Sequence, residues 1–251
     1  MVYYFIMMNK IESAQNLVIK ETVKLQLKKE RKKQKKFIVE GARCVTTFLE
    51  NGYKPVHIFI TKDISDLKDY TTTLVSEIVM QKLSSATSAS GILAVFSYPE
   101  NPLPKELSSG IVLANITDPG NMGTLIRSAA AFGYTSVVII DGCDPFSPKV
   151  IQSTAGTLPL VNLFMWSWQE LQQYKKNIKL IGLVVKNGKT PQQITFNESL
   201  FVIGNESHGI PDEWIKECNE LLTLPMPGKT ESLNAGVAGS LALSLPLLFA
   251  S

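Results

Sequence analysis

Polar side chains that can bind an anion or orient a ligand lie at a few points in the C-terminal half of this chain of 251 residues. Arg127 lies in an apolar stretch and needs a partner there, and the oxygens of a phosphate suit its planar guanidinium. Glu206 offers a carboxylate just after Gly204, where the missing Cβ lets a ligand approach the backbone. Taken singly, these residues also fit ordinary roles: Asn121 as a helix cap, Arg127 on a helix surface, and Glu206 as a cap of the helix that begins near Pro211.

Three glycine-containing peptides carry these residues, and each follows an apolar run typical of a strand. They are Asp118 to Gly123, Phe201 to Gly209, and Leu224 to Gly228, the last of which leads on to Ser232 and Asn234. Proline and glycine make the third peptide an irregular loop, and its two polar residues precede or open the final helix. Such places are where an α/β sheet presents backbone and side chains to a ligand, so the pattern indicates a ligand site.

The elements that must position these peptides alternate between strand and helix patterns with the regularity of βα units. Continuous apolar strands such as 137–140 predict a parallel sheet that is covered on both faces. The expected strands are 111–116, 136–140, 160–164, 180–185, 200–203 and 221–224, and the expected helices are 122–132, 148–155, 168–174, 211–218 and 233–245.

The first hundred residues predict a smaller α/β/α domain, with strands near 37–39, 56–60 and 91–96. Prolines at positions 99, 102 and 104 then mark a boundary, because neither a helix interior nor a central strand tolerates them. We therefore predict two domains, residues 1–100 and residues 106–251.

The three peptides, in this order and spacing, resemble the motifs of the SpoU (TrmH-like) branch of the SPOUT methyltransferases, which methylate RNA ribose with S-adenosylmethionine. The resemblance is close over the C-terminal half. It is looser over the N-terminal half, where 37–41 and 91–95 look like the ribosomal-protein-L30e-like substrate-binding domain that often precedes a SpoU domain. The implied fold class is α/β: a C-terminal parallel-sheet SPOUT domain with a deep trefoil knot, preceded by a smaller L30e-like α/β/α domain. The knot enters only through the resemblance, because chains almost never thread their own loops.

The resemblance also implies roles for individual residues. The family's usual Asn-Val-Ser-Val-Ala reads Asn-Ala-Gly-Val-Ala from Asn234 onward, which shortens two side chains but keeps Ser232 and Asn234. The family's catalytic domain is a homodimer, so a homodimer is expected here. The residues carried over as catalytic are Asn121, Arg127, Glu206, Ser232 and Asn234, and those carried over as contacts of S-adenosylmethionine are Gly204, Leu224, Met226 and Leu233.

A basic run in the N-terminal part is the candidate RNA-binding segment. Residues 1–100 carry 15 basic and 10 acidic side chains, a balance of +5, whereas residues 101–251 carry 10 and 12, a balance of −2. A basic run alone is as often a solvated helix face, but beside methyltransferase motifs it favours RNA as the partner. The predicted RNA-binding residues are Lys28, Lys29, Arg31, Lys32, Lys33, Lys35 and Lys36.

We predict an RNA ribose-2′-O-methyltransferase that uses S-adenosylmethionine, with rRNA favoured over tRNA as the substrate. An arginine has a pKa above about 12 and is a poor base, so we expect Arg127 to hold a phosphate and favour the developing alkoxide. One alternative is an RNA-binding protein without catalysis. A dinucleotide or nucleotide enzyme is less favoured, because neither a GxGxxG nor a P-loop sequence follows the first strand of the βα series.

Metal binding, secretion and membrane anchoring are not expected. The cysteines, Cys44, Cys143 and Cys218, are odd in number and widely spaced, and only two histidines are present, which fits reduced thiols in the cytoplasm and no zinc site. The apolar residues 1–8 lack the basic region and cleavage site of a signal peptide. The apolar stretch 233–250 is interrupted by polar residues and a proline, which favours a buried helix over a membrane span.

Overall fold

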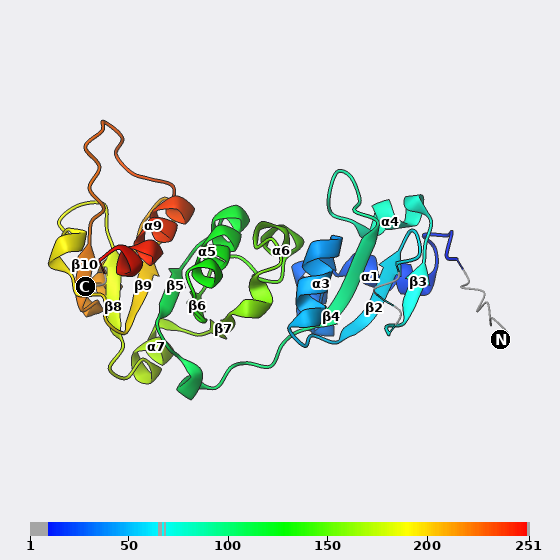
Figure 1. Ribbon diagram of the computed structural model, residues 1–251, viewed down its shortest axis with the longest axis horizontal. Helices are drawn as coiled ribbons and strands as arrows, with labels where there is room; N and C mark the ends of the chain where they lie inside the picture. Colours follow the sequence, from blue (N-terminus) through cyan, green and yellow to red (C-terminus); the bar gives the residue numbers. More distant parts are fainter. Residues whose placement is uncertain (1–9, 65–66, 68, 250–251) are drawn as a thin grey trace. The chain divides into compact units, whose positions relative to one another are not determined.

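The computed structural model describes residues 10–64, 67 and 69–249, which form two compact units (Figure 1). The first unit comprises the residues up to Pro99 together with Phe146–Gly156, and the second comprises the remainder. The segment Phe146–Gly156, called the excursion below, contains α6 (Pro148–Ser153). α6 packs on strand β1 (Lys36–Glu40) of the same unit. The sequence division did not include this excursion, because the helix pattern there continues the βα alternation of the second unit. The apolar residues 1–8 lie outside the described part of the chain.

The first unit is a four-stranded sheet in the order β1-β4-β2-β3. The central strand β4 (Ile92–Ser97) pairs antiparallel with β1 and with β2 (Pro55–Ile60), and β3 (Thr72–Leu74) lies parallel to β2. The buried side chains of α1 (Leu17–Lys24) and α4 (Glu77–Leu83) share a core with one face of the sheet.

The other face of this sheet packs against α3 (Ala42–Glu50), where the rings of Phe37, Phe48 and Phe96 lie 5.1 to 6.0 Å apart. Helix α2 (Lys28–Gln34) carries most of the basic run and leads into β1. The observed arrangement confirms the predicted small α/β/α unit.

The second unit is a six-stranded sheet in which every pair of neighbouring strands is parallel, in the order β10-β8-β9-β5-β6-β7. The central strands are buried along their whole length, as expected for a sheet that is covered on both faces. The predicted parallel sheet is therefore confirmed. Its strands are β5 (Gly110–Ala114), β6 (Ser136–Ile140), β7 (Asn162–Met165), β8 (Lys179–Leu183), β9 (Ser199–Ile203) and β10 (Glu220–Leu222).

Helices α5 (Pro119–Ala131) and α9 (Ala235–Leu248) lie side by side on one face of this sheet (Figure 1). Gly239 permits their close approach, since a Cβ there would lie 2.4 Å from Leu125 Cδ2. On the opposite face α7 (Trp168–Tyr174) and α8 (Asp212–Glu217) pack through the stacked rings of Trp168 and Trp214, 4.7 Å apart. Short 3-10 turns occupy Pro104–Glu106, Leu158–Leu160 and Pro191–Gln193.

The strand order brings two distant loops together at the centre of the sheet. The chain builds β5, β6 and β7 toward one edge and then crosses to β8, so that β9 returns to pair with β5. The loops after β5 and β9 therefore leave the sheet side by side at the point where the strand order reverses, which is where ligands bind in open α/β sheets.

In the part of the chain that the structure describes, no helix combines the length and the apolar character that crossing a membrane requires.

Candidate active site

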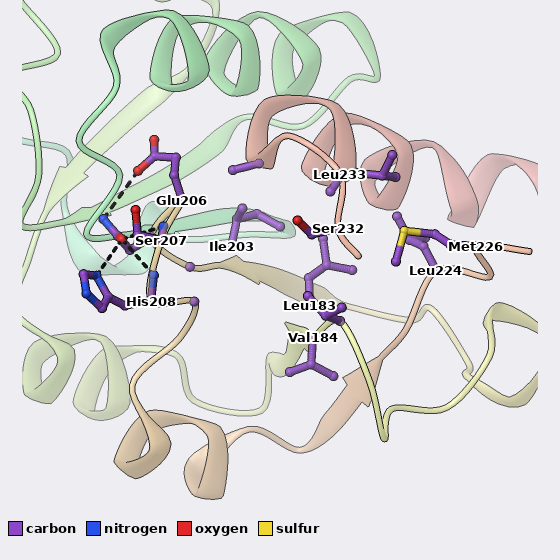
Figure 2. Close-up of a pocket in the computed structure, with 16 residues that line it drawn as sticks. Leu183, Val184, Ile203, Glu206, Ser207, His208, Leu224, Met226, Ser232 and Leu233 are labelled. Carbon is purple, nitrogen blue, oxygen red and sulfur yellow. Dashed lines mark hydrogen bonds between the residues drawn. The ribbon is translucent and has the colours of Figure 1, made fainter. Parts of the chain in front are cut away.

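A cavity of about 340 Å³ opens beyond the carboxyl ends of β8 and β9. Three loops enclose it: the segment after β8, the loop after β9, and residues 223–234 between β10 and α9 (Figure 2). Its volume is typical of a small-molecule site, and most of its wall is apolar. The apolar wall is formed by Leu183, Val184, Val185, Ile203, Leu224, Met226, Leu233, Ala235 and Ala238.

The polar groups of the loop after β9 lie together at one end of the cavity. Figure 2 shows Glu206, Ser207 and His208 at that end, away from Leu224 and Met226. The cavity lining includes all four residues that the family resemblance assigned to the cofactor, together with two of the five that it assigned to catalysis. These lining residues are Gly204, Leu224, Met226 and Leu233, and Glu206 and Ser232.

The loop after β9 turns back on itself within five residues. The backbones of Asn205 and Gly209 exchange two hydrogen bonds, of 3.0 and 2.9 Å, and Gly209 has a φ of 69°. A Cβ at Gly204 would lie 2.2 Å from the carbonyl carbon of Gly209, so only glycine allows the loop to close this tightly. The space left by the missing Cβ of Gly204 is therefore filled by the loop's own backbone.

Glu206 joins this loop to the turn that precedes α5. Its Oε1 accepts hydrogen bonds from the backbone N–H of Asp118 and from Asn121 Nδ2, each at 3.1 Å. Its Oε2 accepts from the hydroxyl and the backbone N–H of Thr117, at 3.1 and 3.3 Å. The ordinary role considered for Glu206, a cap of the helix near Pro211, is therefore wrong, because the carboxylate binds the start of α5 across the switch point.

The same contacts set the charge state of Glu206. Partial burial raises the pKa of the carboxyl group, but the hydrogen bonds from Asn121 and from the backbone of Glu206, Asp118 and Thr117 outweigh it. The net pKa is below that of an ordinary glutamate. Glu206 is consequently an anion at neutral pH beside the cavity.

Asn121 lies in the first turn of α5 and is 8% exposed. It does not cap that helix, because the cap is Asp118, whose Oδ1 accepts a 2.8 Å hydrogen bond from the Asn121 backbone N–H. The predicted capping role of Asn121 is therefore wrong, and its side chain is left free to bind Glu206. Asn234 does open the final helix, since its Oδ1 accepts a 3.2 Å hydrogen bond from Val237 N.

The structure brings Asn121 and Asn234 together across Gly236. The side-chain oxygens of both asparagines lie 3.1 Å from the position that a Cβ on Gly236 would take. Gly236 is also the position where the chain departs from the family's usual serine. Asn121, Asn234 and Glu206 therefore form one group at the cavity, with Ser232 on the wall of the adjoining loop.

Arg127 is placed apart from this group. It is exposed on α5, does not line the cavity, and has no hydrogen bond or ion pair within the described residues. Six residues span about one and two-thirds helical turns, so Arg127 points away from Asn121 by about 120° around the axis of α5. Its guanidinium is thus free to bind a group that comes from outside the unit.

Cys143 follows β6 close to this group, and its Sγ lies 3.5 Å from Met122 Sδ. Burial, with smaller contributions from nearby carboxylates that include Glu206, raises the pKa of its thiol to about 11. The thiol is protonated at neutral pH and cannot act as a nucleophile there. In the described residues, no three His, Cys, Asp or Glu side chains are grouped so that they could hold a metal ion.

The basic run on α2 divides into exposed lysines and one buried arginine. Arg31 is 3% exposed, and its Nη1 donates to the carbonyls of Leu25 and Gln26 at 2.9 and 2.8 Å. This contact caps the end of α1, so the prediction that Arg31 binds RNA is corrected to a structural role. The exposed members of the run are Lys28, Lys29, Lys32, Lys33 and Lys35, and Lys36 is half-buried.

Residues 108–244, more than half of the chain, match the SpoU rRNA Methylase family. A 23S rRNA (guanosine(2553)-2′-O)-methyltransferase, RlmP of Bacillus subtilis, is 31% identical over 93% of this chain and 97% of its own length. The chain belongs to the SpoU rRNA methylase family. Residues 16–94 match a second family, the MRM3-like substrate binding domain.

The chain is also similar to a second curated protein and to a solved structure. A 23S rRNA (uridine(2479)-2′-O)-methyltransferase of Streptomyces viridochromogenes is 25% identical over 82% of this chain and 80% of its own length. The crystal structure of an AdoMet-bound rRNA methyltransferase from Sinorhizobium meliloti superposes with a TM-score of 0.88. That structure covers 96% of this chain and 98% of its own, and at 22% identity it shows that the two chains share a fold.

Sequence reasoning missed one wall of the SpoU cavity. Leu183, Val184 and Val185 line it, yet they were predicted as the end of a strand. β8 ends at Leu183, and Val184 N then bonds to Leu222 O of β10. The available signal was the apolar run that stops at Lys186-Asn187-Gly188, the same change from strand to small and polar residues that marks the three peptides.

Proposed function

We propose that this SpoU chain transfers a methyl group from S-adenosylmethionine to the ribose 2′-hydroxyl of a nucleotide in rRNA. The observation that carries the proposal is the cavity beyond β8 and β9, with Asn121, Glu206 and Asn234 grouped beside it. rRNA is favoured over tRNA because the matching family is one of rRNA methylases and the Bacillus and Streptomyces relatives are both named for 23S rRNA. Those two differ in the nucleotide that they modify, so neither relative's target carries over to this chain.

The cavity fits S-adenosylmethionine in both shape and charge. Its apolar wall suits an adenine ring and an aliphatic chain, and the ionised Glu206 suits the positive charge of the cofactor. The residues that would hold it are Gly204, Leu224, Met226 and Leu233, with Leu183 and Val184 on the wall after β8. When bound, S-adenosylmethionine supplies a methyl group on a positively charged sulfur.

The chain's own task is then to align the ribose and to favour loss of the hydroxyl proton. Arg127, exposed and without a partner in the described residues, is suited to hold a phosphate of the RNA. It does not line the cavity of its own chain, so it would stabilise the developing alkoxide only where the proposed second copy brings it beside the target ribose. Asn121 is held by Glu206, and together with Ser232 and Asn234 it can orient the incoming ribose by hydrogen bonds.

The proposal places RNA recognition on the basic run of the first unit. Five exposed lysines lie within eight residues of α2 and its C-terminal cap. Each phosphate contact releases counterions, with a slope of about −0.7 per contact on single strands, so affinity for RNA should fall steeply with salt. The match of residues 16–94 to a substrate binding domain supports this assignment.

The proposal also includes a homodimer, a trefoil knot and a cytoplasmic location. The outward side of α9 exposes Val237 and Leu241, each by almost half, next to the helix that carries Arg127. A second copy packed there would bury these side chains. The irregular loop 223–234, which leads into α9 and lines the cavity with the β8 and β9 loops, is the segment expected to pass through the knot. The three cysteines are unpaired, which fits a reducing compartment.

Two alternatives predict different results in one experiment. The purified chain is titrated with S-adenosylmethionine by calorimetry and then incubated with labelled cofactor and separate pools of rRNA and tRNA. The proposal predicts binding of the cofactor and label on ribose 2′-oxygens of rRNA. Label on tRNA alone would move the substrate to tRNA, and RNA binding without transfer to either pool would indicate an inactive RNA-binding protein.

A further inference from the structure

One side chain outside the predicted set holds the cavity loop to the centre of the sheet. Asn205 follows Gly204, and its Nδ2 donates a 2.9 Å hydrogen bond to the carbonyl of Asn115, at the end of β5. The same Nδ2 lies 3.4 Å from Glu206 Oε2. Asn115 itself has a φ of 58°, a conformation that asparagine tolerates better than most residues, so the backbone turns sharply where Asn205 binds it.

The other end of the Asn205 amide shapes the cavity loop. Its Oδ1 accepts hydrogen bonds from the backbone N–H groups of Ser207 and His208, at 2.9 and 3.1 Å, and lies 3.2 Å from His208 Nδ1. Because two backbone donors fix this atom as the oxygen, the Nδ2 assignment toward Asn115 follows. Asn205 therefore uses its acceptor to fold the loop that lines the cavity, and its donor to bind the loop after β5.

Glu206 links the loop that Asn205 shapes to the first turn of α5. The carboxylate that Asn205 neighbours also accepts from Thr117 and from Asn121 Nδ2, which lies in the first turn of α5. A shift of the loop at Asn205 would consequently move the acceptor of Asn121. Thr117 acts on the same carboxylate oxygen, Oε2, through a 3.1 Å hydrogen bond from its hydroxyl.

We propose that Asn205 is a positioning residue for methyl transfer. It couples the shape of the loop after β9, which lines the cavity, to the orientation of Asn121 through Glu206. This inference rests on the proposed function. Asn205 itself need touch neither the ribose nor the methyl group. Its donor and acceptor have separable roles, in turnover and in cofactor binding respectively.

The first test separates these two roles with Asn205→Ala and Asn205→Asp. Aspartate keeps an acceptor for Ser207 and His208 but presents an oxygen to the carbonyl of Asn115 and to Glu206. Asn205→Asp should therefore lower kcat by about 10- to 100-fold and change the Kd of S-adenosylmethionine by less than about threefold. Asn205→Ala should lower kcat and also weaken cofactor binding about tenfold. Equal effects of the two variants on both quantities would overturn the proposal.

The second test is a double-mutant cycle between Asn205→Ala and Thr117→Val, read by kcat. Because both residues act through Glu206, the double variant should lose little more than the worse single variant. Losses that multiply would show independent, merely structural contributions and would overturn the proposal. Asn197→Ala, an exposed asparagine at the opposite end of β9, is the matched control and should change neither kcat nor Kd.

The failure of this inference is distinguishable from failure of the proposed function. Methyl transfer by the wild-type chain tests the function, whereas the variants are compared with that wild type. If the wild type transfers no methyl group, the proposed function fails, and so does the inference that depends on it. If it does, only the pattern among the variants decides the role of Asn205.

Discussion

The side-chain amide of Asn121 donates a 3.1 Å hydrogen bond to Glu206 Oε1, across 85 residues of sequence. This bond joins the first turn of α5 to the loop after β9, and it orients the one candidate catalytic asparagine that is buried. Glu206 therefore fixes Asn121 and the start of α5 at the edge of the cavity.

Replacing Glu206 by glutamine should lower kcat more than it weakens cofactor binding. The amide keeps one acceptor oxygen but places an NH₂ group against donors that it cannot satisfy. A hydrogen bond to a charged group is worth about 1.5–3 kcal/mol, so we expect a loss in kcat of about 10- to 100-fold. Turnover and calorimetry on the same preparation check this. A variant with unchanged kcat would show that Asn121 does not depend on the carboxylate.

The pH dependence of stability should show the lowered pKa of Glu206. Its folded pKa lies below the ordinary value, so its ionised form stabilises the fold above that ordinary value. The contribution is lost as the pH falls through the folded pKa. Urea unfolding between about pH 3 and 7 should therefore show a smaller loss of stability on acidification for Glu206→Gln than for wild type.

Glu170 provides the comparison for that measurement. Hydrogen bonds from the backbone and side chain of Ser167 lower its pKa as well, in the capping box of α7. Acidification should thus still destabilise Glu206→Gln through Glu170. If acidification lowered the free energy of unfolding of Glu206→Gln as much as that of wild type, Glu206 would not be hydrogen-bonded as described.

Replacing Arg127 by lysine should reduce turnover far more than cofactor affinity. Lysine keeps the charge but loses the planar fork that binds a phosphate through two parallel hydrogen bonds. We expect kcat to fall about 100-fold, with the Kd for S-adenosylmethionine nearly unchanged, since Arg127 does not line the cavity. Equal losses in both quantities would argue for a structural role of Arg127.

Substitutions of two neighbouring basic residues on α2, Arg31 and Lys32, should have different effects: one on stability and the other on RNA binding. Arg31→Ala removes two hydrogen bonds to backbone carbonyls that cap α1 and should destabilise the protein by about 1–3 kcal/mol in urea unfolding. Lys32→Ala, which alters an exposed side chain, should leave stability unchanged and reduce the salt slope of RNA binding by about 0.7. The reverse pattern would contradict the assignment of these two residues.

Sequence patterns predicted most of the fold because the strands of the second unit are continuous apolar runs. β6 and α7 begin and end where the pattern placed them. The excursion with α6 was not predictable, since its partner β1 lies more than a hundred residues earlier and periodicity reports only local structure. β3, three residues long, is too short to give a reliable pattern.

The candidate site was partly readable for a similar reason. Glycines and prolines mark the ends of strands, so two of the three loops that form the cavity could be named. Which groups bond to one another could not, because that depends on strand order: Glu206 meets Asn121 only because β9 pairs with β5. Arg31 was misread because a run of like charges does not show which of its members is turned inward.

The most direct test of the central claim is a map of ribose 2′-O-methylation in rRNA from cells that lack this gene, complemented with wild type or with Arg127→Lys. We predict that one methylation disappears with the gene, returns with wild type, and stays absent or strongly reduced with Arg127→Lys. An rRNA methylation map that is the same with and without the gene would contradict it.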